Sequence, residues 1–273
     1  MLWWLFNEWD DRDNWEMIVV FANTGKEVEG TLFFVDECAA EWGIDIVWVE
    51  AKCKDENGVP FSKKGWQVKH KIVNYETASR KGEPFEEMCS MLGIPSTAAP
   101  FCSPQLKREA IESYARSIGW EDYHIAIGLR YEEAEKRMNE NWISKKLLYP
   151  FILLKPTTVI DVSIWWSKQH FDLGIHPDDG NCDNCWKKDT PRLVRNMIRR
   201  PDSFTWWEDT TNKYGYIQTR PSQLKMTPPF NFFRGNISVA DIRDMAEMSQ
   251  AELKQLSMFD GPIDGCAESC EVF

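Results

Sequence analysis

The sequence has no hydrophobic run that approaches the ~20 residues needed to cross a bilayer. The longest candidate, residues 147–154, is interrupted by Pro150. A secretory signal is also missing, because the start MLWWLFNEWDDRDNWE has no basic region and no small-residue cleavage site. We therefore expect a cytoplasmic protein with no membrane partner, in which the cysteines are reduced.

An excess of positive charge is missing as well. The 273 residues include 43 Asp and Glu against 32 Lys and Arg, for a net charge of −11. Such a chain repels a polyanion on average, which argues against broad nucleic-acid binding and leaves room only for a local basic patch. The sequence also contains no Walker-type loop, no G-x-S-x-G turn, no H-E-x-x-H helix and no internal repeat.

Cysteine and tryptophan counts are the unusual features that are present. Eight cysteines are too few for a disulfide scaffold in a chain of this length. In a reducing compartment, clustered cysteines indicate metal ligands or reactive thiols instead. Fourteen tryptophans indicate a large aromatic core or stacking surfaces.

The first 160 residues have the pattern of an α/β domain. Helical spacing over residues 1–9 precedes an apolar, β-branched run at 17–21, a helix at 29–42 that Gly43 terminates, and a second strand at 44–49. This alternation is typical of an open parallel sheet with flanking helices. Further elements are expected in the following ranges: a possible strand at 68–75, helices at 84–92 and 105–118, and a strand at 123–127.

The character of the chain changes at residue 161. Residues 161–273 are rich in tryptophan and are predicted to be helical, with helices at 162–170, 192–199, 203–213 and 239–256. Ser238 is the expected N-cap of the last helix, and Asp241 lies in its favourable first turn. The sequence therefore predicts two parts, an α/β domain over 1–160 and a helical part over 161–273.

The strongest local motif is the pair Cys182 and Cys185, since two cysteines separated by two residues can bind one metal ion. One pair is half a site, because zinc or an iron–sulfur cluster needs about four ligands. Cys102 is the best third candidate, as it lies just before a predicted helix whose dipole favours a thiolate. Cys266 and Cys270, near the C-terminus, are either further ligands or part of a frayed end.

Candidate phosphate-binding residues follow two of the predicted strands. Asn23, Thr24 and Gly25 come at the carboxyl end of the first strand, where ligands bind in open α/β sheets. The other candidates are Gly128, Arg130, Arg137 and Lys107. Each of them alone is better explained as a surface charge, and only their gathering around an anion would make a site.

Taken together and in this order, these motifs resemble the phosphoadenosine phosphosulfate reductase-like branch of the adenine nucleotide α-hydrolases, in particular the type found in phages. The resemblance covers most of residues 17–210. It rests on the segments 21–27, 31–35, 42–43, 75–85, 101–107, 127–137, 171–173, 180–188 and 201–207.

The resemblance implies an adenine nucleotide bound at the carboxyl ends of parallel strands, and a 4Fe–4S cluster or zinc held by cysteines. Two departures stand out. The Ser-Gly-Gly-rich pyrophosphate loop and the first strand are missing, so that the chain resembles a family member that begins inside the first helix; truncation and degeneration are both open. The Glu-Cys-Gly-Leu-His tail of true reductases is also missing, and the chain has Gly265-Cys-Ala-Glu-Ser-Cys270 in its place.

Three classes of function remain. The first is an enzyme that acts at the α-phosphate of an adenine nucleotide or in sulfur transfer, with Asn23, Thr24 and Gly25 beside the nucleotide and Lys107 and Arg130 neutralising phosphate charge. The second is an inactive, metal-stabilised module that binds a protein partner through its Trp-rich helical part. The third, a nucleic-acid-binding regulator, is disfavoured by the net charge.

Overall fold

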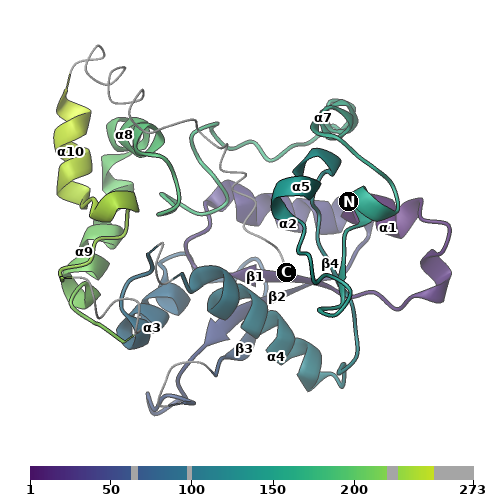
Figure 1. The fold of residues 1–273 in the computed structure, drawn as a ribbon, viewed down its shortest axis with the longest axis horizontal. Coiled ribbons are helices and arrows are strands. Elements are labelled where there is room, and N and C mark those ends of the chain that lie inside the picture. Colours follow the sequence, from purple (N-terminus) through teal and green to yellow (C-terminus); the bar gives the residue numbers. More distant parts are fainter. Residues whose placement is uncertain (63–66, 97–99, 220–226, 249–273) are drawn as a thin grey trace.

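A computed structural model describes residues 1–62, 67–96, 100–219 and 227–248 and shows a mixed α/β protein (Figure 1). No helix among these residues is long and apolar enough to span a membrane. The strands are β1 (Val19–Asn23), β2 (Ile46–Lys52), β3 (Lys69–Val73), β4 (Ile125–Ala126) and β5 (Leu147–Leu148). The α-helices are α1 (Leu2–Asn7), α2 (Glu29–Trp42), α3 (Glu83–Leu92), α4 (Glu109–Ser117), α5 (Ala134–Arg137), α6 (Pro150–Leu153), α7 (Val159–Trp166), α8 (Thr190–Arg199), α9 (Thr205–Tyr214) and α10 (Val239–Glu247).

Local sequence explains the β1–α2–β2 unit. β1 and β2 pair in parallel, with Val19 opposite Ile46, and α2 connects them. The helix ends as predicted at Gly43, which adopts a left-handed φ of 61° and donates its amide to the Ala39 carbonyl. The predicted helix 29–42 is confirmed residue for residue, whereas both strands begin two residues later than predicted.

The expectation of an entirely parallel sheet is wrong in one place. β3 pairs antiparallel with β2, so the three-stranded sheet is mixed. The 16 residues between β2 and β3 contain no helix among those described, and an antiparallel neighbour needs no helical crossover. β4 and β5 form a separate two-stranded parallel sheet, and β4 is shorter than the strand predicted over 123–127.

Helices dominate after residue 159, as predicted. α7, α8 and α9 lie close to the predicted ranges, and α10 begins at Val239 with Ser238 as its N-cap, which accepts a hydrogen bond from the Asp241 amide. The second half of the predicted helix 239–256 lies outside the described residues. The helix predicted over 105–118 is α4 preceded by a π-helical segment, η2 (Cys102–Arg108).

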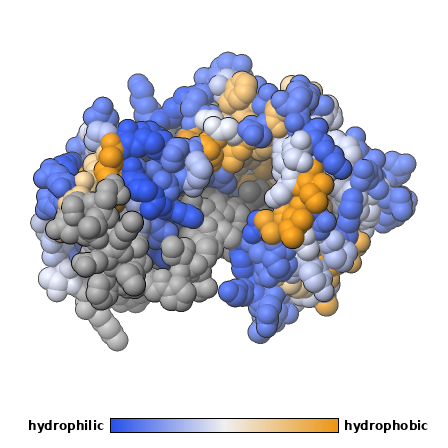
Figure 2. Space-filling model, turned by 90° about the horizontal axis from the view of Figure 1, so that it is seen from above, coloured by the Kyte–Doolittle hydropathy of each residue, from blue (hydrophilic) through white to orange (hydrophobic). Residues whose placement is uncertain are grey.

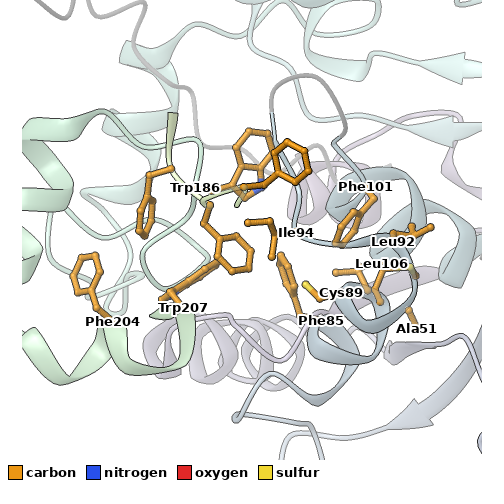
Figure 3. Packing of buried hydrophobic residues seen from close by; sticks show 14 of the residues in the cluster. Ala51, Phe85, Cys89, Leu92, Ile94, Phe101, Leu106, Trp186, Phe204 and Trp207 are labelled. Carbon is orange, nitrogen blue, oxygen red and sulfur yellow. The ribbon is translucent and has the colours of Figure 1, made fainter. Parts of the chain in front are cut away.

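One aromatic-rich core joins the helical part to the sheet (Figure 3). Trp207 of α9 is 1% exposed, and its ring centroid lies 4.8 Å from that of Phe232 and 5.8 Å from that of Phe85 on α3. In Figure 3 the side chain of Trp207 lies between those of Phe204 and Phe85. The same cluster reaches Val49 and Ala51 on β2, so that α3 is packed between the sheet and α9.

The amino group of Met1 makes the folded protein sensitive to pH. Burial, reinforced by the nearby charge of Lys155, lowers the pKa of this amine from about 8 to about 5. Between these values the unfolded chain binds the proton and the folded chain does not, so stability must rise as the pH increases from 5 to 8. At about 1.4 kcal/mol per pKa unit, the gain is on the order of 4 kcal/mol.

Urea unfolding at a series of pH values tests this. We expect the free energy of unfolding to increase between pH 5 and pH 8, and the corresponding slope to disappear when the Met1 amine is acetylated. An acetylated chain with the same slope would assign the pH dependence to other groups.

Candidate functional site

The turn that follows β1 is organised by the buried side chain of Asn23. Its amide nitrogen donates to the Glu50 carboxylate (2.7 Å) and to the Ser79 carbonyl (2.9 Å), while its oxygen accepts the Gly25 amide (3.1 Å). Ser79 in turn donates its own amide to Glu50. The end of β1, the end of β2 and the segment before α3 are therefore fixed together by Asn23.

Glu27 is the buried carboxylate at the centre of the site, with 1% of its side chain exposed. It accepts hydrogen bonds from the amide of Thr24 (2.8 Å) and from the Thr24 hydroxyl (2.8 Å). The ammonium group of Lys107, on η2, lies 3.4 Å from the same carboxylate, and the Cys182 thiol lies 3.7 Å from it. Three segments far apart in the sequence thus converge on one acid.

The Cys182–Cys185 segment reaches Glu27 because its backbone pairs with the turn after β1. The amide of Val28 donates to the Asn181 carbonyl (2.9 Å), and the amide of Asp183 donates to the Lys26 carbonyl (2.6 Å). Glu27 and Cys182 form an antiparallel bridge between these two bonds. The backbone of the motif is therefore held at the carboxyl end of β1.

Lys26 brings a second buried cation to the site. Its ammonium group lies 3.8 Å from the Asp183 carboxylate and 4.8 Å from the ring centroid of Trp206. Burial lowers the pKa of Lys26, and the charges of Asp183, Cys182 and Glu27 act in the opposite direction. Arg200 also donates to Asp183 (2.9 Å), so that this carboxylate has two cationic partners.

A third buried lysine contacts the backbone of the cysteine motif. Lys188 is 0% exposed, and its ammonium group donates to the Cys182 carbonyl over 3.4 Å. Lys26, Lys107 and Lys188 are each no more than 8% exposed. The site thus contains three buried lysines, and its nearby acids are Glu27 and Asp183.

Comparison with known proteins gives one informative match. The chain is similar to the "uncharacterized nin region protein ORF290" of Escherichia phage lambda, with 27% identity over 263 residues, which cover 93% of this chain and 84% of that protein. No model of a known protein family matches the chain, and no solved structure does. The match extends over both the sheet and the helical part.

The predicted nucleotide-binding residues separate into two groups. Asn23, Thr24, Gly25 and Lys107 belong to the site around Glu27. The second group follows β4, where Arg130 and Arg137 both pair with Glu133, at 3.2 and 2.6 Å. Gly128 lies there as well, with its α-carbon facing the Met1 side chain. The first group is thus arranged around Glu27 and the second around Glu133.

The predicted metal ligands are not brought together by the described part of the chain. Within it, no group of three or more histidine, cysteine, aspartate or glutamate side chains is placed to hold a metal ion. Cys102 packs against the hydrophobic core instead, near Cys89, whose thiol pKa is raised first by burial and then by the charges of Glu86 and Cys102. Cys266 and Cys270 lie outside the described residues. The predicted ligand set is thus incomplete within the described residues, and we derive no chemistry through a metal ion.

Lys26 ends the candidate stretch that Asn23, Thr24 and Gly25 begin, and Lys188 lies in the segment 180–188 that carries the family resemblance. The sequence assigned no role to Glu27, which follows Lys26, or to Asp183, which lies between the two cysteines of the motif. Their proximity to predicted residues was the signal that could have identified them. Glu50 carried no such signal, because only the tertiary fold buries it.

Gly25 allows the turn to pack closely. It has a φ of +80°, and a Cβ atom at this position would lie 2.7 Å from the Ser79 hydroxyl and 3.0 Å from the Gly82 α-carbon. Gly43 has a similar φ of +61°, but a Cβ there would meet nothing within 4 Å. We expect Gly25→Ala to cost at least ~1 kcal/mol more than Gly43→Ala, because only the first adds a steric clash to the backbone strain.

Chemical denaturation of the two variants measures this difference. Equal decreases in the free energy of unfolding would show that the turn around Gly25 accommodates the added methyl group without loss of stability.

The metal hypothesis from the sequence has a direct test. Protein purified without oxygen should contain iron or zinc, and Cys182→Ser and Cys185→Ser should reduce the metal content to background. Cys38→Ser is the matched control, because Cys38 is a buried residue of α2. Metal-free wild-type protein from metal-supplemented cells would rule out the hypothesis.

Proposed function

We propose that this protein binds an adenine nucleotide or a sulfonucleotide at the carboxyl end of β1, in the manner of the phosphoadenosine phosphosulfate reductase-like proteins that its sequence resembles. The observation that carries the proposal is the presence at one site of three lysines that are each no more than 8% exposed: Lys26 beside Asp183, Lys107 beside Glu27 and Lys188 beside the Cys182 carbonyl. Burying a cation is costly unless anionic partners compensate for the lost water. A phosphate group would add such a partner.

The place in the fold supports the same ligand class. Ligands of open α/β sheets bind outside the carboxyl ends of the strands. Asn23 ends β1, and Thr24 and Gly25 begin the turn that continues into α2. Glu50 fixes this turn from β2, the parallel neighbour of β1. An anion at this edge would be held by a pre-organised turn and not by a mobile surface group.

The proposed chemistry is reaction at the α-phosphate or transfer of sulfur. Both pass through states in which negative charge develops on oxygen, and buried cations stabilise such charge more strongly than exposed ones do. Lys107 would carry this role at the site, while Glu27 holds the Lys107 ammonium group in place. We assign no nucleophile and no general acid.

Calorimetric titration with ATP and with adenosine phosphosulfate tests the proposal. We expect Lys107→Gln to weaken binding roughly ten- to hundredfold, the effect of removing one hydrogen bond to a charged group. The control is Lys168→Gln, which makes the same change in charge at an exposed position outside the site. Thermal unfolding of both variants verifies that they fold.

Two results would contradict the proposal: no heat of binding for wild-type protein with either nucleotide, or equal affinities for the Lys107 and Lys168 variants. A reaction product detected with wild-type protein alone would extend it from binding to catalysis.

A second candidate function, docking of a protein partner, is favoured by α7. This helix has no buried residue although six of its eight side chains are apolar, and Ile160 and Ile164 are 66% and 50% exposed. α7 lies at the top of Figure 1 and faces the viewer in Figure 2, where apolar patches interrupt a hydrophilic surface. A partner that binds here should be lost with Ile160→Lys while nucleotide affinity is unchanged.

A further inference from the structure

The lysines of the proposed anion site are covered by other parts of the chain. Lys26 and Lys107 are 8% and 6% exposed, so a ligand from solvent reaches them only past the residues around them. One of these residues is Gly82, where a Cβ atom would lie 2.9 Å from the Cδ atom of Lys26. The segment 79–82, which precedes α3, therefore lies directly beside a buried cation of the site.

The same segment is attached to the end of β1. The Ser79 carbonyl accepts a hydrogen bond from the Asn23 side chain (2.9 Å). Arg80 follows Ser79 and precedes the contact of Gly82 with Lys26, so both of its neighbours along the chain belong to the site. The side chain of Arg80 is 32% exposed. It is therefore a cation beside the site that a ligand in solvent can reach directly.

The guanidinium group of Arg80 is held in place by two uncharged partners. Its Cζ atom lies 4.9 Å from the ring centroid of Tyr75, and its Nη1 atom donates to the Ala78 carbonyl (3.0 Å). Ala78 is 5% exposed and packs with Leu32 and Trp48, which fixes this carbonyl. Neither partner neutralises the positive charge. The position of the guanidinium group is thus set independently of any carboxylate.

Glu29 occupies the two remaining donor positions of Arg80. Its carboxylate oxygens accept hydrogen bonds from Nε (2.7 Å) and from Nη2 (3.1 Å), a bidentate arrangement. Arginine binds phosphate groups with the same two-point geometry. Glu29 is 57% exposed and lies in the first turn of α2, two residues after Glu27. An exposed ion pair of this kind contributes little stability, so an anion can replace its carboxylate at small cost.

We propose that Arg80 is a further anion-binding residue of this site and that Glu29 is its internal competitor. On binding, one anionic group of the ligand replaces the Glu29 carboxylate on the Arg80 guanidinium group, while another lies at the buried lysines. The ligand is accordingly one with two or more linked anionic groups, a nucleoside polyphosphate or a phosphosulfate, and not a monophosphate. The inference rests on the proposed nucleotide site, because it assigns a second contact of the same ligand.

Calorimetric titration of the full chain with ATP, AMP and inorganic pyrophosphate tests the proposal. We expect Arg80→Gln to weaken the binding of ATP and of pyrophosphate at least about tenfold, the effect of losing a hydrogen bond to a charged group. The affinity for AMP should be unchanged, because its single phosphate group lies at the lysines. Pyrophosphate makes this comparison independent of adenosine recognition.

Glu29→Gln is expected to act in the opposite direction. Removing the competing carboxylate should tighten ATP binding about two- to fivefold, which corresponds to the contribution of an exposed ion pair. A purely structural ion pair would instead give weaker binding in both variants. In the Arg80→Gln background the gain should disappear, because Glu29 then has no guanidinium group to occupy.

The matched control is a second bidentate ion pair. Arg195 on α8 donates to the Asp178 carboxylate through Nε (2.9 Å) and Nη2 (2.7 Å). Arg195→Gln makes the same change in charge as Arg80→Gln, and it should leave the affinities for all three ligands unchanged. Thermal unfolding of every variant verifies that it folds.

Two results would overturn the assignment of Arg80 and Glu29. Equal weakening of ATP and AMP binding by Arg80→Gln would show that Arg80 contacts no second anionic group. An equal gain from Glu29→Gln with and without Arg80 would show that Glu29 acts by general repulsion and not by competition.

The remaining results separate this inference from the proposed function. Unchanged binding of ATP and pyrophosphate by Arg80→Gln, together with weaker binding by Lys107→Gln, would contradict the inference alone. Pyrophosphate binding that depends on Arg80, with no heat from either nucleotide, would support the anion contact and contradict the nucleotide site. Absence of binding for all three ligands would contradict both.

Discussion

The structure around the site depends on the burial of two oppositely charged neighbours, Lys26 and Glu27. Their side chains leave water at adjacent positions of one turn, and each then requires partners that the turn itself cannot supply in full. Glu27 finds Thr24 locally, but Lys107 and Cys182 come from η2 and from the cysteine motif. Lys26 finds Asp183 and the ring of Trp206. The burial of Lys26 and Glu27 therefore brings η2, the cysteine motif and the start of α9 to this turn.

The need of these buried charges for partners also explains why the helical part contacts the turn after β1. Asp183 is held by Arg200, at the end of α8, while Asn184 adopts a left-handed φ of 41° and accepts a hydrogen bond from Asn196 on that helix. Backbone bonds from residues 181–183 to the turn after β1 then transmit this position to the sheet. Removing a carboxylate or a lysine here would leave its partner buried and unpaired, which costs more than the pair itself contributes.

Sequence periodicity predicted the elements whose causes are local. The range of α2 follows from its apolar spacing and from Gly43, and the N-cap of α10 follows from Ser238 and Asp241. The antiparallel direction of β3 could not be predicted in this way, because strand direction depends on the path of a long connection and not on the strand residues. β4 is shorter than its apolar pattern suggested, since only two of its residues have a pairing partner in β5.

The site was predictable in part, because only some of its residues are marked by local sequence. Asn23, Thr24 and Gly25 were identified because a strand end is visible in sequence, and Lys107 because it follows a helix start. The pairing of Glu27 with Lys107 was not visible, since burial and not spacing decides which charges need one another. Lysines spread along the chain from residue 26 to residue 188 become a site only when the fold removes them from water.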